Sequence, residues 1–400
     1  MSEPVELTIS AMGARGEGVA ETSGDPIYVP GALPGETVLA TVNGNRAVMT
    51  DCVSPSPERV TPPCKYFGQC GGCQLQHWTP DAYRAWKLDL VVTALAHQGL
   101  EAHVNDLVTA YGAGRRRATL HATPERAGFM SRRSHEIAAI DHCPILVPAL
   151  ADAPALAVAI ARLAGPCDVA FTATDTGLDL ALPAKTRIAD RGALANLAHK
   201  NDIARISAGT EILIQRRASQ LTFGKATVAL PPQSFLQATS AAEEALAQLV
   251  CDHLGKSKKV ADLFSGLGPF ALRIAERAQI FAADSNAAAI TACDTALQAT
   301  PGLKRIGTEV RDLFRDPYVA EELKKFDTVI LDPPRAGAEA QCRELARSSV
   351  KTIISVSCDP RSFARDARIL VDGGYKIGSV TPVDQFQYAA HVEVVAVFRR

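Results

Sequence analysis

The stretch KVADLFSGLGPF, from Lys259 to Phe270, joins a short apolar run to a turn that contains Gly266 and Gly268. An apolar run followed by glycines and then by helix-forming residues is typical of a buried strand that turns into a helix. Because glycine has no side chain, the backbone of such a turn can approach a ligand closely. The glycine pair alone predicts only a tight turn, and the surrounding sequence decides whether it holds a ligand.

Further apolar runs of strand length follow this stretch, separated by segments of helix length. They are QIFAAD (279–284), RIGTEV (305–310), FDTVILD (326–332) and KTIISVSC (351–358). Strands that alternate with helices predict an α/β fold with a parallel, doubly wound sheet. Two later runs, YKIGSVTPV (375–383) and HVEVVAVFRR (391–400), have no helix between them and predict an antiparallel pair at one edge. Seven strands in this order resemble the Rossmann-like layout of methyltransferases that use S-adenosylmethionine.

Acidic residues stand where the predicted strands end. Asp284 ends the second strand, about 20 residues after the glycine turn, where a carboxylate can accept hydrogen bonds from ribose hydroxyls. Asp312 follows the third strand and Asp332 ends the fourth. A helix cap could explain any one of these residues, but their common position at one edge of the sheet favours a cofactor site.

A cysteine is expected at the same edge. Cys358 stands in ISVSCDP (354–360), at the end of the strand next to the one that ends in DPPR (332–335). A thiolate that attacks carbon 6 of a pyrimidine activates carbon 5 for methylation, and a base must then remove the carbon-5 proton. Glu393, at the start of the last predicted strand, is the candidate base. The alternatives for these two residues are a small buried thiol and a charge that protects an edge strand.

The N-terminal part alternates short β-type runs with Gly, Pro and Asn turns, between Val5 and Val53. About five short strands with such turns predict a small barrel of the OB type. The proline-rich stretch SPSPERVTPPC (54–64) is typical of a linker. We therefore predict three domains, over residues 1–56, 57–231 and 232–400.

The composition is that of an ordinary globular chain, with 400 residues, 47% hydrophobic residues and a formal net charge of −1. Because this net charge does not indicate a nucleic-acid partner, any such partner must be recognised by a local patch. The start MSEPVELTIS lacks the pattern of a secretory signal. The most apolar window (149–165) is interrupted by Asp152 and Arg162, which favours a buried helix over a membrane span. We expect a cytoplasmic monomer with no membrane contact.

Four of the ten cysteines form a candidate metal site. Cys64, Cys70 and Cys73 stand in CKYFGQCGGC, and Cys143 stands in DHCPIL. Four thiolates suit an iron–sulfur cluster or a zinc ion. The C-x5-C-x2-C spacing with a distant fourth cysteine departs from the short pairs typical of zinc sites, which favours the cluster and leaves zinc as the alternative.

Taken together, the motifs resemble those of the RNA uracil-5-methyltransferase family. The resemblance is carried by SFLQAT (234–239), DLFSGLGPF (262–270), VILDPPRAG (329–337), SVSCDP (355–360) and HVEVV (391–395). It implies that Cys358 is the nucleophile and Glu393 the base. The residues that it implies for S-adenosylmethionine are Gln237, Phe264, Gly266, Gly268, Asp284, Asp312 and Asp332. Amino-group methyltransferases are disfavoured because they carry an Asn-Pro-Pro-aromatic motif in place of DPPR.

The resemblance also implies the remaining architecture and the substrate. It implies a Rossmann-like seven-stranded methyltransferase domain, an N-terminal OB-like TRAM barrel that binds RNA, and a central α+β domain with a 4Fe-4S cluster on the four cysteines. The members most similar to this chain methylate carbon 5 of a uridine in bacterial 23S rRNA. The alternatives are a tRNA uracil-5-methyltransferase and a non-catalytic RNA-binding or redox-sensing relative.

Three positions depart from the family pattern. Thr239 and Pro269 stand where the family usually has Asn, so contacts to the cofactor from these positions are not expected. Asp359 replaces the Asn of the commoner SCNP, and an acid beside the nucleophile raises a thiol pKa unless its side chain points away.

The segment GRRRATLHATPERAGFMSRR (114–133) is the candidate RNA contact. It holds six arginines and one glutamate, with His121 and Phe129 between them. Arginine planes and aromatic rings can stack on unpaired bases while the charge holds phosphates, and the alternative is a solvated charged face. Because the target base must leave its stack to reach a thiol in a crevice, we expect a uridine in a loop.

Overall fold

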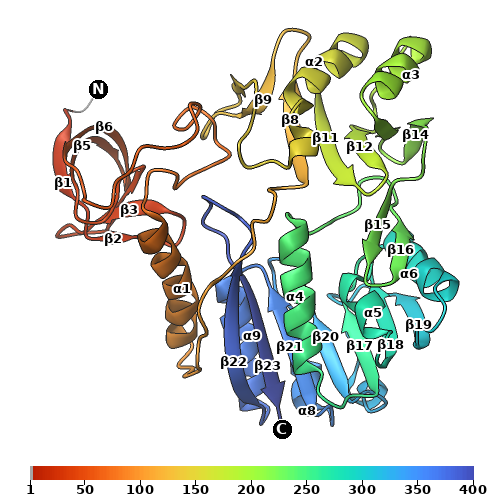
Figure 1. Ribbon diagram of the computed structural model, residues 1–400. Helices are drawn as coiled ribbons and strands as arrows, with labels where there is room; N and C mark the ends of the chain where they lie inside the picture. The colour runs from red at the N-terminus through yellow and green to blue at the C-terminus, as the bar shows by residue number, and fades with distance from the viewer. Residues whose placement is uncertain (1–2) are drawn as a thin grey trace.

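Six short strands at the N-terminal end form one curled sheet, in the order β1-β5-β6-β4-β3-β2 (Figure 1). The computed structural model describes residues 3–400. The strands are β1 (Val5–Thr8), β2 (Ala11–Met12), β3 (Glu17–Ala20), β4 (Ile27–Pro30), β5 (Thr37–Asn43) and β6 (Arg46–Ser54). Along β5, the fully buried Val38 and Ala40 alternate with more exposed residues, because successive side chains of a strand point to opposite faces. The sequence predicted a small OB-type barrel of about five strands, and the structure has one curled sheet of six strands at this position.

The central unit consists of a seven-stranded sheet, in the order β10-β9-β8-β11-β12-β13-β14, and the helices that cover it. Its strands are β8 (Arg117–Ala122), β9 (Ala127–Met130), β10 (Ile137–Ala139), β11 (Cys167–Thr174), β12 (Gly177–Leu182), β13 (Ile203–Ala208) and β14 (Glu211–Gln215). Its helices are η1 (Pro148–Leu150), α2 (Ala153–Ala164) and α3 (Arg191–Lys200). Ala157 and Ile160 of α2 pack against Leu120 and Phe171 of the sheet.

An eight-stranded sheet forms the C-terminal unit, in the order β19-β18-β17-β20-β21-β23-β22-β7. Its strands are β7 (Val108–Thr109), β17 (Lys259–Leu263), β18 (Gln279–Asp284), β19 (Arg305–Val310), β20 (Thr328–Leu331), β21 (Thr352–Ser357), β22 (Lys376–Asp384) and β23 (Glu393–Arg399). The five strands from β17 to β21 are parallel, and β23 lies antiparallel between β21 and β22. This arrangement confirms the expected mixed α/β methyltransferase fold. The short strand β7 was not predicted, because two residues carry no periodicity.

Helices cover both faces of this sheet. One face packs against α4 (Ser240–His253), α5 (Pro269–Ile274) and α6 (Ala287–Ala299). The other face packs against α1 (Pro80–His97), α7 (Ala320–Leu323), α8 (Glu339–Arg347) and α9 (Pro360–Asp372). The parallel strands are therefore buried on both faces, which explains their continuous apolar runs in the sequence.

Two segments that the predicted boundaries assign to the central domain pack on the C-terminal sheet instead. Val91, Ala94 and Leu95 of α1 lie in one of its apolar cores. The hairpin β15 (Gln220–Phe223) and β16 (Ala226–Ala229) contributes to the core on the opposite face. Both segments cover apolar surface of the C-terminal sheet that residues 232–400 alone leave exposed. A local sequence pattern does not reveal which sheet such a segment packs against.

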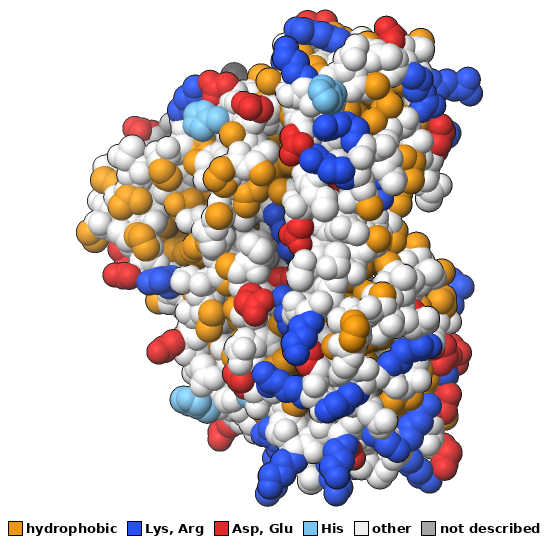
Figure 2. All heavy atoms as spheres, turned by 45° about the vertical axis from the view of Figure 1, so that its right-hand side comes forward, with side chains coloured by type: hydrophobic (Ala, Val, Ile, Leu, Met, Phe, Trp, Pro, Cys, Tyr) orange, Lys and Arg blue, Asp and Glu red, His pale blue; other side chains and the backbone are white. Residues whose placement is uncertain are grey.

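The distribution of charged side chains can be followed on one face of the molecule. On the face drawn in Figure 2, Lys and Arg side chains are spread over the upper and lower parts of the molecule and are interspersed with Asp and Glu. Within the described residues, no helix combines the length and the apolarity needed to cross a membrane. The most apolar window of the sequence forms α2, whose buried residues face the central core.

Candidate active site

The glycine turn between β17 and α5 adopts a left-handed backbone at three positions. Phe264, Gly266 and Gly268 have φ values of 64°, 52° and 77°. A Cβ on Gly268 would lie 2.5 Å from the Sγ of Cys293 on α6, so the packing of α5 against α6 requires glycine. A Cβ on Gly266 would meet no protein atom within 4 Å, so this side of the turn is open. A non-glycine residue such as Phe264 is strained at positive φ, and such strain is common at ligand sites.

Asp284 holds this turn from the end of β18. Its two carboxylate oxygens accept hydrogen bonds from the backbone N–H groups of Gly266, at 2.9 Å, and Asn286, at 2.7 Å. Each carboxylate oxygen has a further lone pair, so the group can still accept hydrogen bonds from a ribose. Asp284 is therefore both a support of the turn and a candidate ligand.

Asp312 lies after β19 and is exposed. One of its oxygens accepts a hydrogen bond from the backbone N–H of Phe314, at 3.1 Å. The Phe314 ring lies 5.4 Å from the Phe264 ring and is 48% exposed, so two aromatic rings stand beside the two carboxylates. We did not identify Phe314 from the sequence. The available signal was an aromatic residue two positions after an acid near the end of a strand, a spacing that Asp262 and Phe264 share.

Two further acids lie beneath the turn. Burial and the charge of Asp284 raise the pKa of Asp332, directly after β20, to about 7. Asp262 of β17 is fully buried and accepts a hydrogen bond from the backbone N–H of Ala271, at 3.0 Å. Its burial raises its pKa well above the usual range for a carboxyl group. The site can therefore hold protonated acids at neutral pH.

Cys358 lies between β21 and α9, at the carboxyl edge of the sheet, and is half-buried. Burial and the charges of Glu393 and Asp332 raise the pKa of its thiol to about 12. The neighbouring Asp359 points to the start of α9, where one carboxylate oxygen accepts hydrogen bonds from two backbone N–H groups at 2.9 and 3.0 Å. Asp359 is therefore a helix cap, and the acids that raise the thiol pKa come from other strands.

Glu393 begins β23 and is 3% exposed. Burial and the charge of Asp332 raise the pKa of its carboxyl to about 8. Its Oε1 accepts a hydrogen bond from the Nε2 of Gln385, at 2.8 Å, and the same nitrogen donates to the Oε1 of Gln237, at 2.6 Å. The structure thus connects the predicted base to a predicted cofactor residue. Gln385, which joins them, carried no signal in the sequence.

Asp384 anchors the start of the loop that carries Gln385. Its buried carboxylate accepts hydrogen bonds from the hydroxyls of Tyr83, at 3.1 Å, and Tyr111, at 2.6 Å, and from the fully buried ammonium of Lys87. The Lys87 Nζ also donates to the backbone oxygen of His391, at 2.7 Å. Because Tyr83 and Lys87 belong to α1, this helix holds both ends of the loop between β22 and β23. The loop rises into the space where the three units meet (Figure 1).

The departures at Thr239 and Pro269 have structural explanations. The Thr239 hydroxyl accepts a hydrogen bond from the backbone N–H of Ala242, at 3.0 Å, and caps α4, while donating to the backbone oxygen of Ala110, at 2.6 Å. Pro269 occupies the first turn of α5, where its missing N–H has no partner to lose. Both residues therefore begin helices of the sheet's α4–α6 face.

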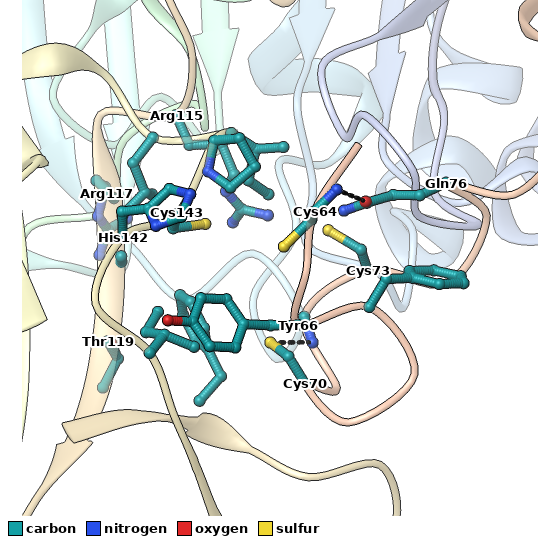
Figure 3. A pocket seen from close by; sticks show the side chains of 18 residues that line it. Cys64, Tyr66, Cys70, Cys73, Gln76, Arg115, Arg117, Thr119, His142 and Cys143 are labelled. Atoms are coloured by element: carbon teal, nitrogen blue, oxygen red, sulfur yellow. Dashed lines mark hydrogen bonds between the residues drawn. The ribbon is translucent and has the colours of Figure 1, made fainter. Parts of the chain in front are cut away.

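The four predicted metal ligands line one cavity of about 240 Å³ (Figure 3). Cys64, Cys70 and Cys73 come from one loop, and Cys143 faces them from the opposite wall. The other lining groups include aromatic rings and no Asp or Glu side chain. In residues 3–400, no three Cys, His, Asp or Glu side chains are close enough to hold a single metal ion. For the described residues, this arrangement therefore supports neither the expected iron–sulfur cluster nor the zinc alternative, although the four cysteines line the same cavity.

The cysteine loop also supports the loop between β22 and β23. The backbone N–H groups of Gln74 and Leu75 donate to the backbone oxygen of Tyr388, at 2.8 and 3.1 Å. The side chain of Gln74 accepts a hydrogen bond from the backbone N–H of Ala390, at 3.2 Å. Cys73 is thus one residue away from a direct contact with the loop that ends at Glu393.

Comparison with known proteins identifies the family. The sequence model described as tRNA (Uracil-5-)-methyltransferase matches residues 220–400. An uncharacterized RNA methyltransferase of Brucella suis is 45% identical over 100% of this chain and 99% of that protein. The 23S rRNA (uracil(1939)-C(5))-methyltransferase RlmD of Halomonas elongata is 32% identical over 97% of this chain and 88% of that protein. The chain belongs to the RNA uracil-5-methyltransferase family.

This protein is therefore an RNA methyltransferase that uses S-adenosylmethionine. Its fold is shared with the tRNA (uracil-54, C5)-methyltransferase of Pyrococcus abyssi, solved with S-adenosyl-L-homocysteine. The TM-score is 0.77 at 24% identity, and the match covers 98% of this chain and 99% of that one.

The arginine-rich segment of the methyltransferase does not form a single surface. Arg116 is buried and pairs with Glu243, at 2.5 Å, so it belongs to the interior. Arg133 pairs with Glu17 of the curled sheet and so joins two units. Arg115 and Arg117 line a cavity of about 230 Å³ together with Gln237 and Gln385.

A larger cleft of about 790 Å³ opens beside Cys358. It is lined by Arg335 and His391 next to the thiol, by Arg15 from the curled sheet, and by residues of α1. Arginine side chains from separate units therefore line the cleft of the cysteine, together with Asp89 and Asp359. Arginines in this position suit contacts with the phosphates of a polyanionic substrate.

Proposed function

We propose that the methyltransferase methylates carbon 5 of a uridine in 23S rRNA through a covalent adduct with Cys358. The main support is the relation between Cys358 and Glu393. In the antiparallel pair of β21 and β23, Ser357 is the partner of Val394. Cys358 directly follows Ser357 and Glu393 directly precedes Val394, so both lie at the same end of this strand pair. A nucleophile and a base at adjacent positions can serve successive steps on one base ring.

In the proposed reaction, the Sγ of Cys358 releases its proton to solvent and bonds to carbon 6, and the electron pair of the C5–C6 double bond moves toward O4. Carbon 5 then takes the methyl group from the sulfonium, and S-adenosylhomocysteine leaves. Glu393 removes the proton from carbon 5, the double bond forms again, and the bond between carbon 6 and sulfur breaks. Cys358 is returned as a thiolate.

We further propose that Gln237, Phe264, Gly266, Gly268, Asp284, Asp312 and Asp332 bind S-adenosylmethionine. The open side of the Gly266 turn and the remaining lone pairs of Asp284 support this assignment. The exposed ring of Phe314 is the addition that we make to this set.

We also propose that Cys64, Cys70, Cys73 and Cys143 hold a 4Fe-4S cluster. Their support is the common cavity and the all-thiol donor set. When bound, such a group would tie the loop that begins at Cys64 to the loop of Cys143, and so stabilise the central unit. The curled N-terminal sheet is the proposed TRAM domain that contacts RNA, and its Arg15 lies in the cleft of Cys358.

The choice of 23S rRNA rests on the similarity to the RlmD of Halomonas elongata over nearly the whole chain. The competing choice is tRNA, because the matching family model and the Pyrococcus abyssi enzyme carry that substrate in their names. The deciding experiment maps 5-methyluridine in rRNA and tRNA from a strain that lacks the gene. We expect one 23S rRNA site to lose the modification and to regain it with the wild-type gene but not with Cys358→Ala. Loss confined to tRNA would replace this proposal.

A further inference from the structure

We propose that Gln385 is a positioning residue that links the amide of Gln237 to the carboxyl of Glu393 and keeps Glu393 ready to accept a proton. This inference rests on the covalent mechanism proposed above. It extends that mechanism because it assigns a role to a residue that touches neither the thiol nor the turn of β17.

The hydrogen bonds of Gln385 fix the orientation of its amide. The backbone N–H of Ala238 donates to the Oε1 of Gln385, at 2.7 Å. A backbone N–H can only donate, so the oxygen of the amide must face Ala238 and its nitrogen must face the other way. That nitrogen donates to the Oε1 of Gln237, at 2.6 Å, and to the Oε1 of Glu393, at 2.8 Å. With 1% of its surface exposed, Gln385 has no alternative partner in water.

This orientation determines what Gln237 presents. Because the Oε1 of Gln237 accepts from Gln385, the amide nitrogen of Gln237 is left to donate. Within the described part of the chain, that nitrogen has no protein acceptor, and Gln237 lines the cavity shared with Arg115 and Arg117. The donor is therefore available for a carboxylate or carbonyl oxygen of a bound ligand.

The same orientation favours the ionised form of Glu393. Burial and the negative charge of Asp332 disfavour ionisation, whereas the hydrogen bond from Gln385 and the charges of Arg335 and Lys87 favour it. The charge of Glu393 in turn raises the pKa of the Cys358 thiol. Asp384 and His391 lie in the same loop, where Lys87 contacts the Asp384 carboxylate and the backbone oxygen of His391. The Gln385 donor is the only side-chain hydrogen bond to Glu393 among residues 3–400. Its removal leaves the carboxylate buried without a donor.

The position of Gln385 is itself held rigidly. Asp384, the preceding residue, is tied to α1 through Lys87 and Tyr83, and it accepts a hydrogen bond from the backbone N–H of Phe386, at 2.9 Å. The backbone on both sides of Gln385 is therefore fixed, so its amide has little freedom to follow another partner. This rigidity is what a positioning residue requires.

The test is the replacement of Gln385 by Met, which keeps the length of the side chain and removes both donor and acceptor. Single-turnover reactions would be run with RNA and cofactor, and the decay of the covalent adduct would be followed as a function of pH. Since the base works in its ionised form, its rate rises with pH through its pKa. Loss of a hydrogen bond to a buried carboxylate raises that pKa, so we expect the half-maximal pH to rise by about one unit or more.

A second substitution of Gln385 and a substitution of the nearby Gln387 serve as comparisons. Gln385→Glu keeps an acceptor for the N–H of Ala238 but adds an acid beside Glu393, so we expect a larger upward shift. Gln387→Met changes the same loop at a partly exposed position whose side chain makes no hydrogen bond in the described structure, and its profile should match that of the wild type. Thermal unfolding and binding of S-adenosylhomocysteine verify that each variant is folded.

A folded Gln385→Met enzyme with the wild-type pH profile for adduct decay would overturn this inference and leave the covalent mechanism intact. An active Cys358→Ala enzyme would instead overturn the mechanism, and no adduct would then form in any variant. A variant that lowers the rate equally at every pH would show that Gln385 has a purely structural role.

Discussion

Cys358 and Glu393 lie at the same end of the β21 and β23 pair, because Cys358 directly follows Ser357 and Glu393 directly precedes its partner Val394. Glu393 affects the ionisation of the Cys358 thiol. The charge of Glu393 contributes to the pKa of about 12 at the Cys358 thiol. A thiol in this environment is protonated at neutral pH, so its activation must come with the substrate.

Substitutions of Cys358 and Glu393 should block different steps of the reaction. Cys358→Ala should abolish methyl transfer, because no adduct can form, while binding of S-adenosylhomocysteine by calorimetry stays close to that of the wild type. Glu393→Gln should transfer one methyl group and then stall, leaving a protein–RNA adduct that survives denaturing gel electrophoresis. If Glu393→Gln releases methylated RNA at the wild-type rate, the base is another residue.

The reactivity of the thiol in the free enzyme should be low and should depend on Glu393. Because only the thiolate is alkylated, the raised pKa of about 12 should make iodoacetamide labelling of Cys358 at pH 8 slower than that of an ordinary cysteine. Glu393→Gln removes a nearby negative charge, so labelling measured by peptide mass spectrometry should become faster. Glu339→Gln, on the surface of α8, is the matched control. Equal labelling rates in all three proteins would contradict this electrostatic coupling.

The cluster should be visible in protein purified without oxygen. We expect a brown protein with broad absorbance at the blue end of the visible spectrum, and about four irons per chain by metal analysis. Cys70→Ser should remove the colour and lower the thermal stability of the central unit, since the cavity loses one of its four thiols. Cys167→Ser changes a cysteine outside this cavity and should keep the colour. Colourless wild-type protein with one zinc per chain would exclude the cluster.

The buried pair of Lys87 and Asp384 should contribute strongly to stability. Lys87→Met leaves the carboxylate buried without its cation, which typically costs about 3–5 kcal/mol. Because Tyr83 and Tyr111 still donate to Asp384, we expect the lower end of that range in urea unfolding followed by tryptophan fluorescence. Arg343→Met breaks an exposed pair with Glu339 on α8 and should leave the midpoint unchanged. Identical midpoints for Lys87→Met and the wild type would show that the pair is dispensable.

The sequence by itself determined the elements whose pattern is local. The alternation of apolar runs and helix-length segments predicted the mixed α/β fold, because parallel strands buried on both faces have continuous apolar sequences. The turn residues between Val5 and Val53 likewise predicted the short N-terminal strands, which form one curled sheet. The family was recognisable because its motifs follow the strand ends in a fixed order. The roles assigned to Cys358, Glu393 and the four cysteines remain predictions for the experiments above.

Only the tertiary structure decided which residues support the site. Gln385 acquires its role because β22 and the segment after β16 bring it between Gln237 and Glu393, residues that lie 148 and 8 positions away in the chain. Three adjacent arginines look alike in the sequence, yet Arg116 is buried against Glu243 while Arg115 and Arg117 line a cavity. The sequence likewise did not reveal that α1 packs on the C-terminal sheet. Local patterns report which face of an element is apolar, but hydrogen bonds and packing between distant segments depend on how the chain folds back on itself.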